Sequence, residues 1–122
     1  IFISGQLALT ENGVENAGKI KEKYDINLLK NSIEIATSNL LWNLNDCIED
    51  IDNDVSKLSC CNIKGYFNCD EDFKDHPSLL NLSSDIIVEV LGENGHHSRT
   101  AIGVSSLPLN SPVEIEGIFS IS

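Results

Sequence analysis

Residues 113–121 alternate between apolar side chains and acidic or small polar ones, and this alternation constrains the fold more than any other feature of the sequence. The residues that share one face are Val113, Ile115, Gly117, Phe119 and Ile121. Glu114 and Glu116 face the other way. Because successive side chains of a strand point to opposite faces, the pattern predicts a strand in a sheet that is covered on one face. The other face is expected to be solvated or covered by another subunit.

Two further segments have the periodicity of amphipathic helices. Asp25 or Asn27 can cap the first, and Pro77 suits the first helical position of the second, after Asp75 or His76. The apolar stripe of the first helix is Leu29, Ile33, Ala36, Leu40 and Leu44. The stripe of the second is Leu79, Leu82, Ile86 and Val90, with Gly92 placed to end the helix. Both stripes predict helices that lie on a sheet.

Strands are expected before, between and after these helices. Asn12 and Gly13 predict a tight hairpin turn, since both residues tolerate a positive φ, and Gly65 is a candidate bulge. The expected strands cover residues 1–9, 14–20, 55–67, 99–107 and 113–121. The order β-β-α-β-α-β-β predicts an α+β fold, a mixed sheet with two helices on one face.

Length and charge limit the organisation of the chain and its partners. The 122 residues fit a single domain over residues 1–122, and since the chain starts at Ile1 and contains no methionine, we expect further residues before it. It has no apolar run of the roughly 20 residues that cross a bilayer. With 19 acidic and 8 basic residues, the net charge of −11 is expected to repel polyanions. We therefore expect neither nucleic acid nor a membrane as a partner.

The residues that commonly bind metals or form disulfides give no recognisable motif. A chain of this length does not need disulfide bridges, so reduced thiols are expected. The cysteines are Cys47, Cys60, Cys61 and Cys69. The acidic run 49–54 lacks the glycine and glutamate of a calcium loop. His96 and His97 have no partner at ligand spacing and are expected to form a polar loop. We predict no metal site and no cofactor.

Arg99 and Glu114 remain as candidates for chemistry. Arg99 is the only arginine among the 8 basic residues, and a planar guanidinium can bind a carboxylate through two parallel hydrogen bonds. Glu114 lies one strand later and faces away from the apolar residues. From the residues alone, a salt bridge on the surface is the simpler explanation of this pair.

Four short blocks give the chain a resemblance to a known family. They are SGQ at 4–6, HSRTAIGV at 97–104, LPL at 107–109 and VEIE at 113–116. In this order they resemble the signature blocks of the RidA/YjgF family, also called endoribonuclease L-PSP-like. The segment 81–93 resembles a branch of that family whose activity is unassigned. The resemblance covers essentially the whole chain.

The resemblance implies a chorismate-mutase-like fold of the bacillar type, assembled as a trimeric barrel with ligand clefts between subunits. In members of the family, an arginine that matches Arg99 binds a substrate carboxylate. A glutamate that matches Glu114 positions water for attack on an imine or enamine, which releases ammonia and a 2-oxo acid. Ser4, Gly5 and Ala101 would line the same cleft. The expected partner is a small carboxylate-bearing metabolite, bound by a cytoplasmic homotrimer.

Three functions stay open on the sequence. The first is an enamine/imine deaminase, and the second is a non-catalytic trimeric module that binds small carboxylate metabolites. The third and weakest is an endoribonuclease, because the acidic charge balance opposes RNA binding. Ala101 stands where many active deaminases of the family have a cysteine, two residues after the arginine.

Overall fold

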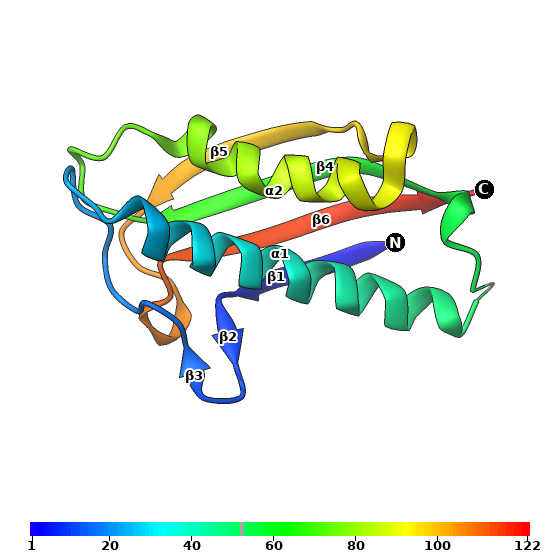
Figure 1. Ribbon diagram of the computed structural model, residues 1–122, viewed down its shortest axis with the longest axis horizontal. Helices are drawn as coiled ribbons and strands as arrows, with labels where there is room; N and C mark the ends of the chain where they lie inside the picture. Colours follow the sequence, from blue (N-terminus) through cyan, green and yellow to red (C-terminus); the bar gives the residue numbers. More distant parts are fainter. Residues whose placement is uncertain (52) are drawn as a thin grey trace.

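The computed structural model describes residues 1–51 and 53–122, and its centre is a four-stranded sheet (Figure 1). The strands lie across the sheet in the order β1 (Phe2–Leu7), β6 (Val113–Ile121), β4 (Leu58–Asn68) and β5 (Ser98–Val104). β6 is antiparallel to both of its neighbours, whereas β4 and β5 are parallel. The helices α1 (Ile26–Glu49) and α2 (His76–Leu91) cover one face of the sheet. The predicted α+β fold, with a mixed sheet and two helices on one face, is confirmed.

Short elements connect these strands and helices. β2 (Leu9–Thr10) and β3 (Gly13–Val14) form a separate hairpin, and Gly13 has a φ of 106°, as its turn requires. The return strand predicted over 14–20 is confined to its first residue, followed by a bridge from Ile20 to Cys69. Short 3-10 helices cover Val55–Lys57, Gly92–Gly95 and Pro108–Asn110. Asp52, in the acidic run where we expected no calcium site, lies outside the described residues.

Helix α1 begins where its sequence predicts. Asp25 Oδ1 accepts hydrogen bonds from the backbone N–H groups of Asn27 (3.0 Å) and Leu28 (3.3 Å), which caps the first turn. The predicted stripe is buried, and Ile48 extends it by one turn. Two buried hydroxyls, of Thr37 on α1 and Ser83 on α2, lie 2.9 Å apart and join the helices within the core.

Helix α2 is rotated relative to its predicted orientation. Its buried residues are Leu79, Leu80, Ser83 and Ile87, whereas Val90, which was predicted to be buried, is 53% exposed. Leu80 lies against Gly65 of β4, where a Cβ would be 2.6 Å from Leu80 Cδ1. The prediction of a bulge at Gly65 is wrong, because this glycine instead lets the helix approach the sheet closely. The register irregularity of β4 lies between Cys60 and Asn62.

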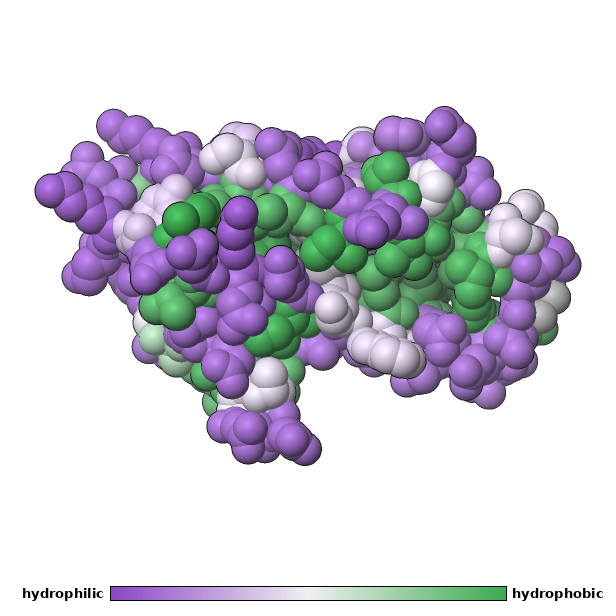
Figure 2. Space-filling model, viewed as in Figure 1, coloured by the Kyte–Doolittle hydropathy of each residue, from purple (hydrophilic) through white to green (hydrophobic). Residues whose placement is uncertain are grey.

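The two faces of the sheet differ in character. Figure 2 shows hydrophobic side chains between α1 and α2, where a shallow groove of about 80 Å³ is lined by residues that include Leu44 and Ile48. On the opposite face, Phe2 is 81% and Ile102 is 44% exposed, and no described helix covers them. Neither α1 nor α2 combines the length and hydropathy of a membrane span within the described residues.

Candidate functional site

Arg99 lies on the edge strand β5, and its side chain points toward α2. It pairs in register with buried Ile63 of β4, and paired residues share a face of the sheet. Its guanidinium Nη2 donates to Pro77 O (3.1 Å) and to Asn81 Oδ1 (2.7 Å), and Nη1 donates to Ser84 Oγ (3.2 Å). These bonds hold the half-buried guanidinium beside α2. They use three of the five N–H groups that a guanidinium carries.

Ser84 and His97 extend this group of hydrogen bonds. His97 Nε2 lies 2.9 Å from Ser84 Oγ, and His97 Nδ1 lies 2.5 Å from the carbonyl oxygen of Gly95. Because a carbonyl can only accept, Nδ1 carries a proton, and in the neutral imidazole Nε2 accepts the hydrogen bond of the Ser84 hydroxyl. The expectation of a polar loop holds for exposed His96. It holds for His97 too, which lies in the loop before β5, but this loop residue is also hydrogen-bonded to Ser84, which contacts Arg99.

These side chains border an open pocket of about 540 Å³. It is lined by Asn81, Ser84, Asp85, Val88 and Glu89 of α2, and by His96, His97 and Arg99. The helical residues repeat at three- and four-residue intervals, which places them on one face of α2. Cationic Arg99 and the acidic side chains of α2 therefore meet in a pocket large enough for a small metabolite.

Glu114 lies on the opposite face of the sheet, which the helices leave open. It pairs in register with Tyr66 of β4 and Leu7 of β1. It also abuts Gly5, where a Cβ would be 2.6 Å from Glu114 Cδ. Ser4 and Gly5 form the irregular part of β1, so they lie near Glu114. Desolvation by burial, followed by repulsion from the neighbouring Glu116, raises the pKa of Glu114.

The structure therefore brings together only part of the predicted site. Ser4, Gly5 and Glu114 form one group on the open face, whereas Arg99 belongs to a second group on the helix-covered face. Within one chain, Arg99 and Glu114 do not meet among the described residues, and their meeting in a cleft between subunits stays a prediction. The surface salt bridge that the sequence allowed between them is also absent from the described residues of one chain.

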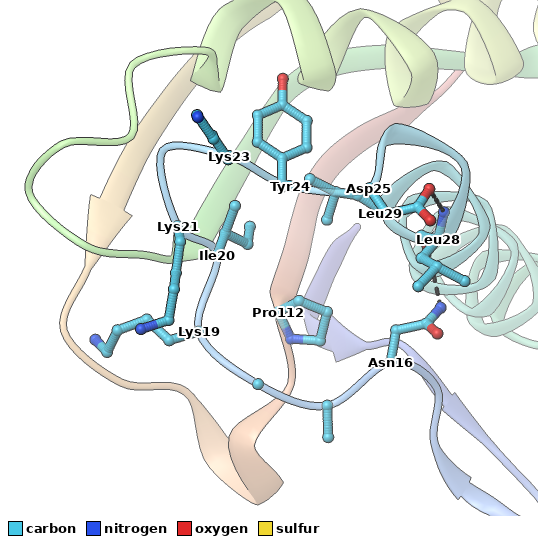
Figure 3. A pocket seen from close by; sticks show the side chains of 12 residues that line it. Asn16, Lys19, Ile20, Lys21, Lys23, Tyr24, Asp25, Leu28, Leu29 and Pro112 are labelled. Atoms are coloured by element: carbon cyan, nitrogen blue, oxygen red, sulfur yellow. Dashed lines mark hydrogen bonds between the residues drawn. The ribbon is translucent and has the colours of Figure 1, made fainter.

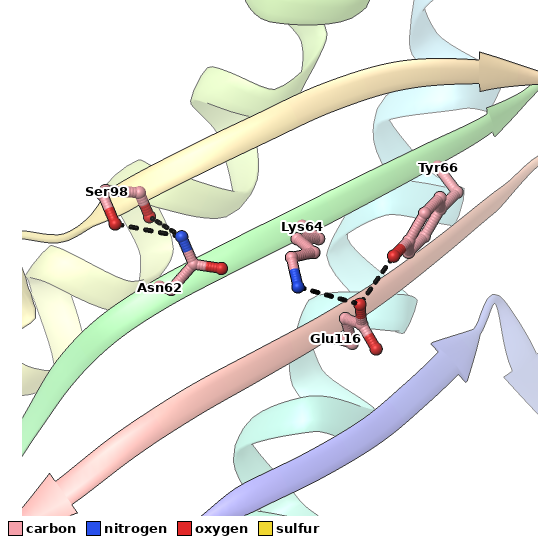
Figure 4. Close-up of polar contacts among 5 residues, drawn as sticks. All are labelled: Asn62, Lys64, Tyr66, Ser98 and Glu116. Carbon is pink, nitrogen blue, oxygen red and sulfur yellow. Dashed lines mark hydrogen bonds and ion pairs between the residues drawn. The ribbon is translucent and has the colours of Figure 1, made fainter.

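A polar network next to Glu114 was not predicted from the sequence (Figure 4). Tyr66 Oη donates to Glu116 Oε1 at 2.6 Å, and Lys64 Nζ lies 3.8 Å from the same oxygen. This hydrogen bond is the main reason that the pKa of Tyr66 rises to about 12. Nearby, Asn62 Nδ2 donates to Ser98 Oγ at 2.9 Å. The alternation along β4 could have predicted this network, because it places Asn62, Lys64 and Tyr66 on one face of the sheet.

A second pocket, of about 270 Å³, lies before α1 and is shown in Figure 3. Lys19, Lys21 and Lys23 lie along its loop, but two of them already have partners. Lys19 Nζ donates to the carbonyl oxygen of Ser105, and Lys21 lies 3.9 Å from Asp70. Exposed lysines of this kind are weak evidence for a specific anion site.

A third pocket contains the pair of Cys69 and His76, whose Sγ and Nε2 atoms are 3.6 Å apart. Gly103 permits this contact, because a Cβ there would lie 2.7 Å from the sulfur. Burial raises the pKa of the Cys69 thiol, and a neutral thiol is a poor nucleophile. Within residues 1–51 and 53–122, no three His, Cys, Asp or Glu side chains are grouped to hold a metal ion.

Comparison with known proteins relates this architecture to others. No family model matches the chain. Protein TCP17 of Trypanosoma cruzi is 24% identical over 123 residues, which cover 100% of this chain and 75% of that protein. Among solved structures, Atu1372 of Agrobacterium tumefaciens, a protein of unknown function, has a TM-score of 0.89 at 29% identity. The match covers 99% of this chain and 75% of that one.

Two further structures connect the fold to a family. A proposed endoribonuclease from Shewanella oneidensis has a TM-score of 0.84 at 24% identity, over 99% of this chain and 78% of that one. YyfB of Yersinia pestis, a Rid-family protein of unknown function, has a TM-score of 0.57 at 17% identity, over 100% of this chain and 77% of that one. This chain has a RidA/YjgF-like fold.

Within this RidA/YjgF-like fold, Ala101 follows Arg99 on the same side of β5 and is half-buried in register with Gly65. The side chain in that position is therefore a methyl group rather than a thiol. The groups that do contact Arg99 are Asn81, Ser84 and the Pro77 carbonyl, none of which the sequence singled out as a site residue. A polar stripe on an otherwise apolar helix was the signal that could have found them.

Proposed function

We propose that this RidA-like protein hydrolyses small imines and enamines to 2-oxo acids and ammonia. Arg99 binds the substrate carboxylate and Glu114 positions the attacking water. The observation that carries the proposal is that Arg99 is held by α2 at the edge of a pocket of about 540 Å³. A charge-assisted hydrogen bond contributes about 1.5–3 kcal/mol, and two of them would also fix the orientation of the ligand.

The active unit in this proposal is a homotrimer of single RidA/YjgF-like domains, a chorismate-mutase-like barrel. Arg99 is on edge strand β5, and Glu114 lies beside β1, which forms the other edge. Subunits that meet edge to edge would place Arg99 of one copy near Glu114 of the next, and Ser4, Gly5 and Ala101 would line the shared cleft. Exposed Phe2 and Ile102 on the helix-free face support such contacts.

The reaction needs only water and proton transfers. The water oxygen attacks the imine carbon, and the electron pair of the C=N bond moves to nitrogen. Glu114, whose raised pKa makes it a better base than an exposed glutamate, accepts a hydrogen bond from that water. The adduct then expels ammonia as the carbonyl forms, so one imine and one water give one 2-oxo acid and one ammonia.

Freshly generated 2-aminoacrylate tests the proposal, with pyruvate and ammonia as the measured products. We expect the wild type to exceed the uncatalysed rate, and Arg99→Ala to return to it. Arg99→Lys keeps the charge but loses the planar guanidinium that is hydrogen-bonded to α2, so it should recover little of the activity. Equal rates for the wild type and Arg99→Ala would contradict the proposal.

A second candidate is a non-catalytic module that binds small carboxylates. The separation of Arg99 from Glu114 within one chain favours it, as does the methyl group at Ala101. Saturable binding of 2-oxo acids without turnover would support this alternative. An endoribonuclease is the weakest candidate, because 19 acidic residues face 8 basic ones. RNA cleavage that persists through purification and is lost in a site variant would revive it.

A further inference from the structure

Ser84 and His97 form the only described chain of side-chain hydrogen bonds that joins a histidine to Arg99. His97 follows the 3-10 helix Gly92–Gly95, and Ser84 lies in the middle of α2. The Gly95 carbonyl fixes the histidine tautomer by accepting from Nδ1 at 2.5 Å. The lone pair of Nε2 is thereby turned toward Ser84, at 2.9 Å.

The donor and acceptor roles of the Ser84 hydroxyl are defined as a result. Its proton goes to His97 Nε2, and its oxygen accepts from Arg99 Nη1 at 3.2 Å. An oxygen that donates to a base and accepts from a cation can take a proton from a third group while it releases its own. Ser84 is half-buried and lines the pocket, so a ligand held by Arg99 would lie within its reach.

We propose that Ser84 and His97 are the proton relay of the Arg99 pocket. This inference rests on the proposed imine hydrolysis. As the water oxygen bonds to the carbon of a protonated imine, a water proton passes to Ser84 Oγ and the Ser84 proton passes to His97 Nε2. The same path then returns a proton to the amine nitrogen. The C–N bond breaks, the hydroxyl proton leaves with the ammonia as ammonium, and the carbonyl remains. Glu114 of a second copy orients the water, whereas Ser84 and His97 move its proton.

Other charged groups around His97 shape the expected pH response. Asp85 and Glu89 face the pocket from α2, His96 from the connecting loop and Arg99 from β5. The relay requires an unprotonated Nε2 for its first transfer. Protonation of Nε2 would block that transfer, so the turnover rate is expected to fall when the pH is lowered far enough to protonate this nitrogen.

The test compares His97→Gln and Ser84→Ala with His76→Gln, which makes the same change at a histidine that lies outside the Arg99 pocket, beside Cys69. We expect the first two to lower kcat for 2-aminoacrylate by about 100-fold or more, the usual scale of general acid–base catalysis. Binding of 2-oxobutanoate, measured by calorimetry, should stay within about threefold, since Arg99 is intact. The control should retain kcat within about twofold.

The possible outcomes distinguish a failure of the proton relay from a failure of the proposed imine hydrolysis. The pH dependence of kcat should flatten in His97→Gln, which a purely structural role would not produce. If this variant keeps the wild-type kcat and pH profile while Arg99→Ala is inactive, the relay is wrong and imine hydrolysis stands. If the wild type releases no ammonia, both are overturned. Nitrogen NMR of the resting protein needs no turnover, and a proton on Nε2 rather than Nδ1 of His97 would also overturn the relay.

Discussion

The two faces of the sheet hold their candidate residues in different ways. On the helix-covered face, Arg99 is tied to α2 by three hydrogen bonds, and Ser84 and His97 continue the network. On the open face, Glu114 lies against the backbone of Gly5 with a raised pKa. The first group is organised within one chain. The second has Lys64 beside Glu116, and in our proposal it receives Arg99 from a neighbouring subunit. This difference makes the two faces separable by experiment.

The largest expected difference between the two faces is the unfolding free energy lost when an apolar side chain is shortened. Ile115, with 0% exposure on the covered face, should lose about 2–5 kcal/mol of unfolding free energy when replaced by alanine. Ile102→Ala, on the open face at 44% exposure, should cost less than about 0.5 kcal/mol in the dissociated chain. Urea unfolding at low protein concentration measures both. If the proposed trimer forms, light scattering should show that Ile102→Ala weakens it instead. Equal unfolding losses would remove the distinction between the faces.

A pair of glycines gives a second comparison. A Cβ at Gly65 would meet Leu80 in the core, so Gly65→Ala should cost about 1–3 kcal/mol of stability. A Cβ at Gly5 would meet the movable end of Glu114, so Gly5→Ala should cost less than about 1 kcal/mol. Its effect should appear as a fall of about tenfold or more in ammonia release, since the glutamate is displaced. Normal activity in Gly5→Ala would argue against a role for Glu114.

Loss of a polar contact should also cost more stability on the helix-covered face than on the open face. Thr37→Val removes the buried hydroxyl contact with Ser83, and leaving that group without a partner costs about 1–3 kcal/mol. Lys64→Met removes an exposed ion pair with Glu116 at 3.8 Å, which should cost less than about 0.5 kcal/mol. Thermal unfolding of the two variants compares them directly. A larger loss in Lys64→Met would mean that the open face is buried in the assembly.

The smallest expected effect is a pH dependence of stability. The pKa of Glu114 is raised from 4.5, so the folded chain holds this proton more tightly than the unfolded chain does. Stability from this group is therefore present below pH 4.5 and is lost as the pH rises through the raised value. Glu114→Gln should remove that component from a series of urea titrations between pH 4 and 7. An unchanged slope would show that burial does not perturb this carboxyl.

Local patterns predicted the framework of the fold but not the rotation of its second helix. Asp25, the stripe of α1 and the alternation of β6 are each decided by neighbours in sequence, and all three predictions are confirmed. The buried face of α2 is decided by the close approach of Leu80 to Gly65, a contact between distant segments. Periodicity alone therefore predicted burial for Val90, which is exposed.

The candidate site was only partly predictable for the same reason. Glu114 could be assigned to the open face because its strand alternates clearly. The face of Arg99 depends on its parallel register with Ile63 of β4, which no local pattern specifies. The partnership of Ser84 with His97 joins a helix to a loop across 13 positions in the sequence, so the histidine resembled an ordinary polar loop residue.

The central claim is that Arg99 of one subunit and Glu114 of another complete a single site, and mixed trimers test it most directly. Arg99→Ala and Glu114→Gln chains are each expected to be inactive alone. When the two are refolded together, a cleft that takes Arg99 from one and Glu114 from the other is intact. We expect about a quarter of the wild-type rate of ammonia release, the statistical share of such clefts. Mixed trimers that are no more active than either variant alone would contradict the shared site.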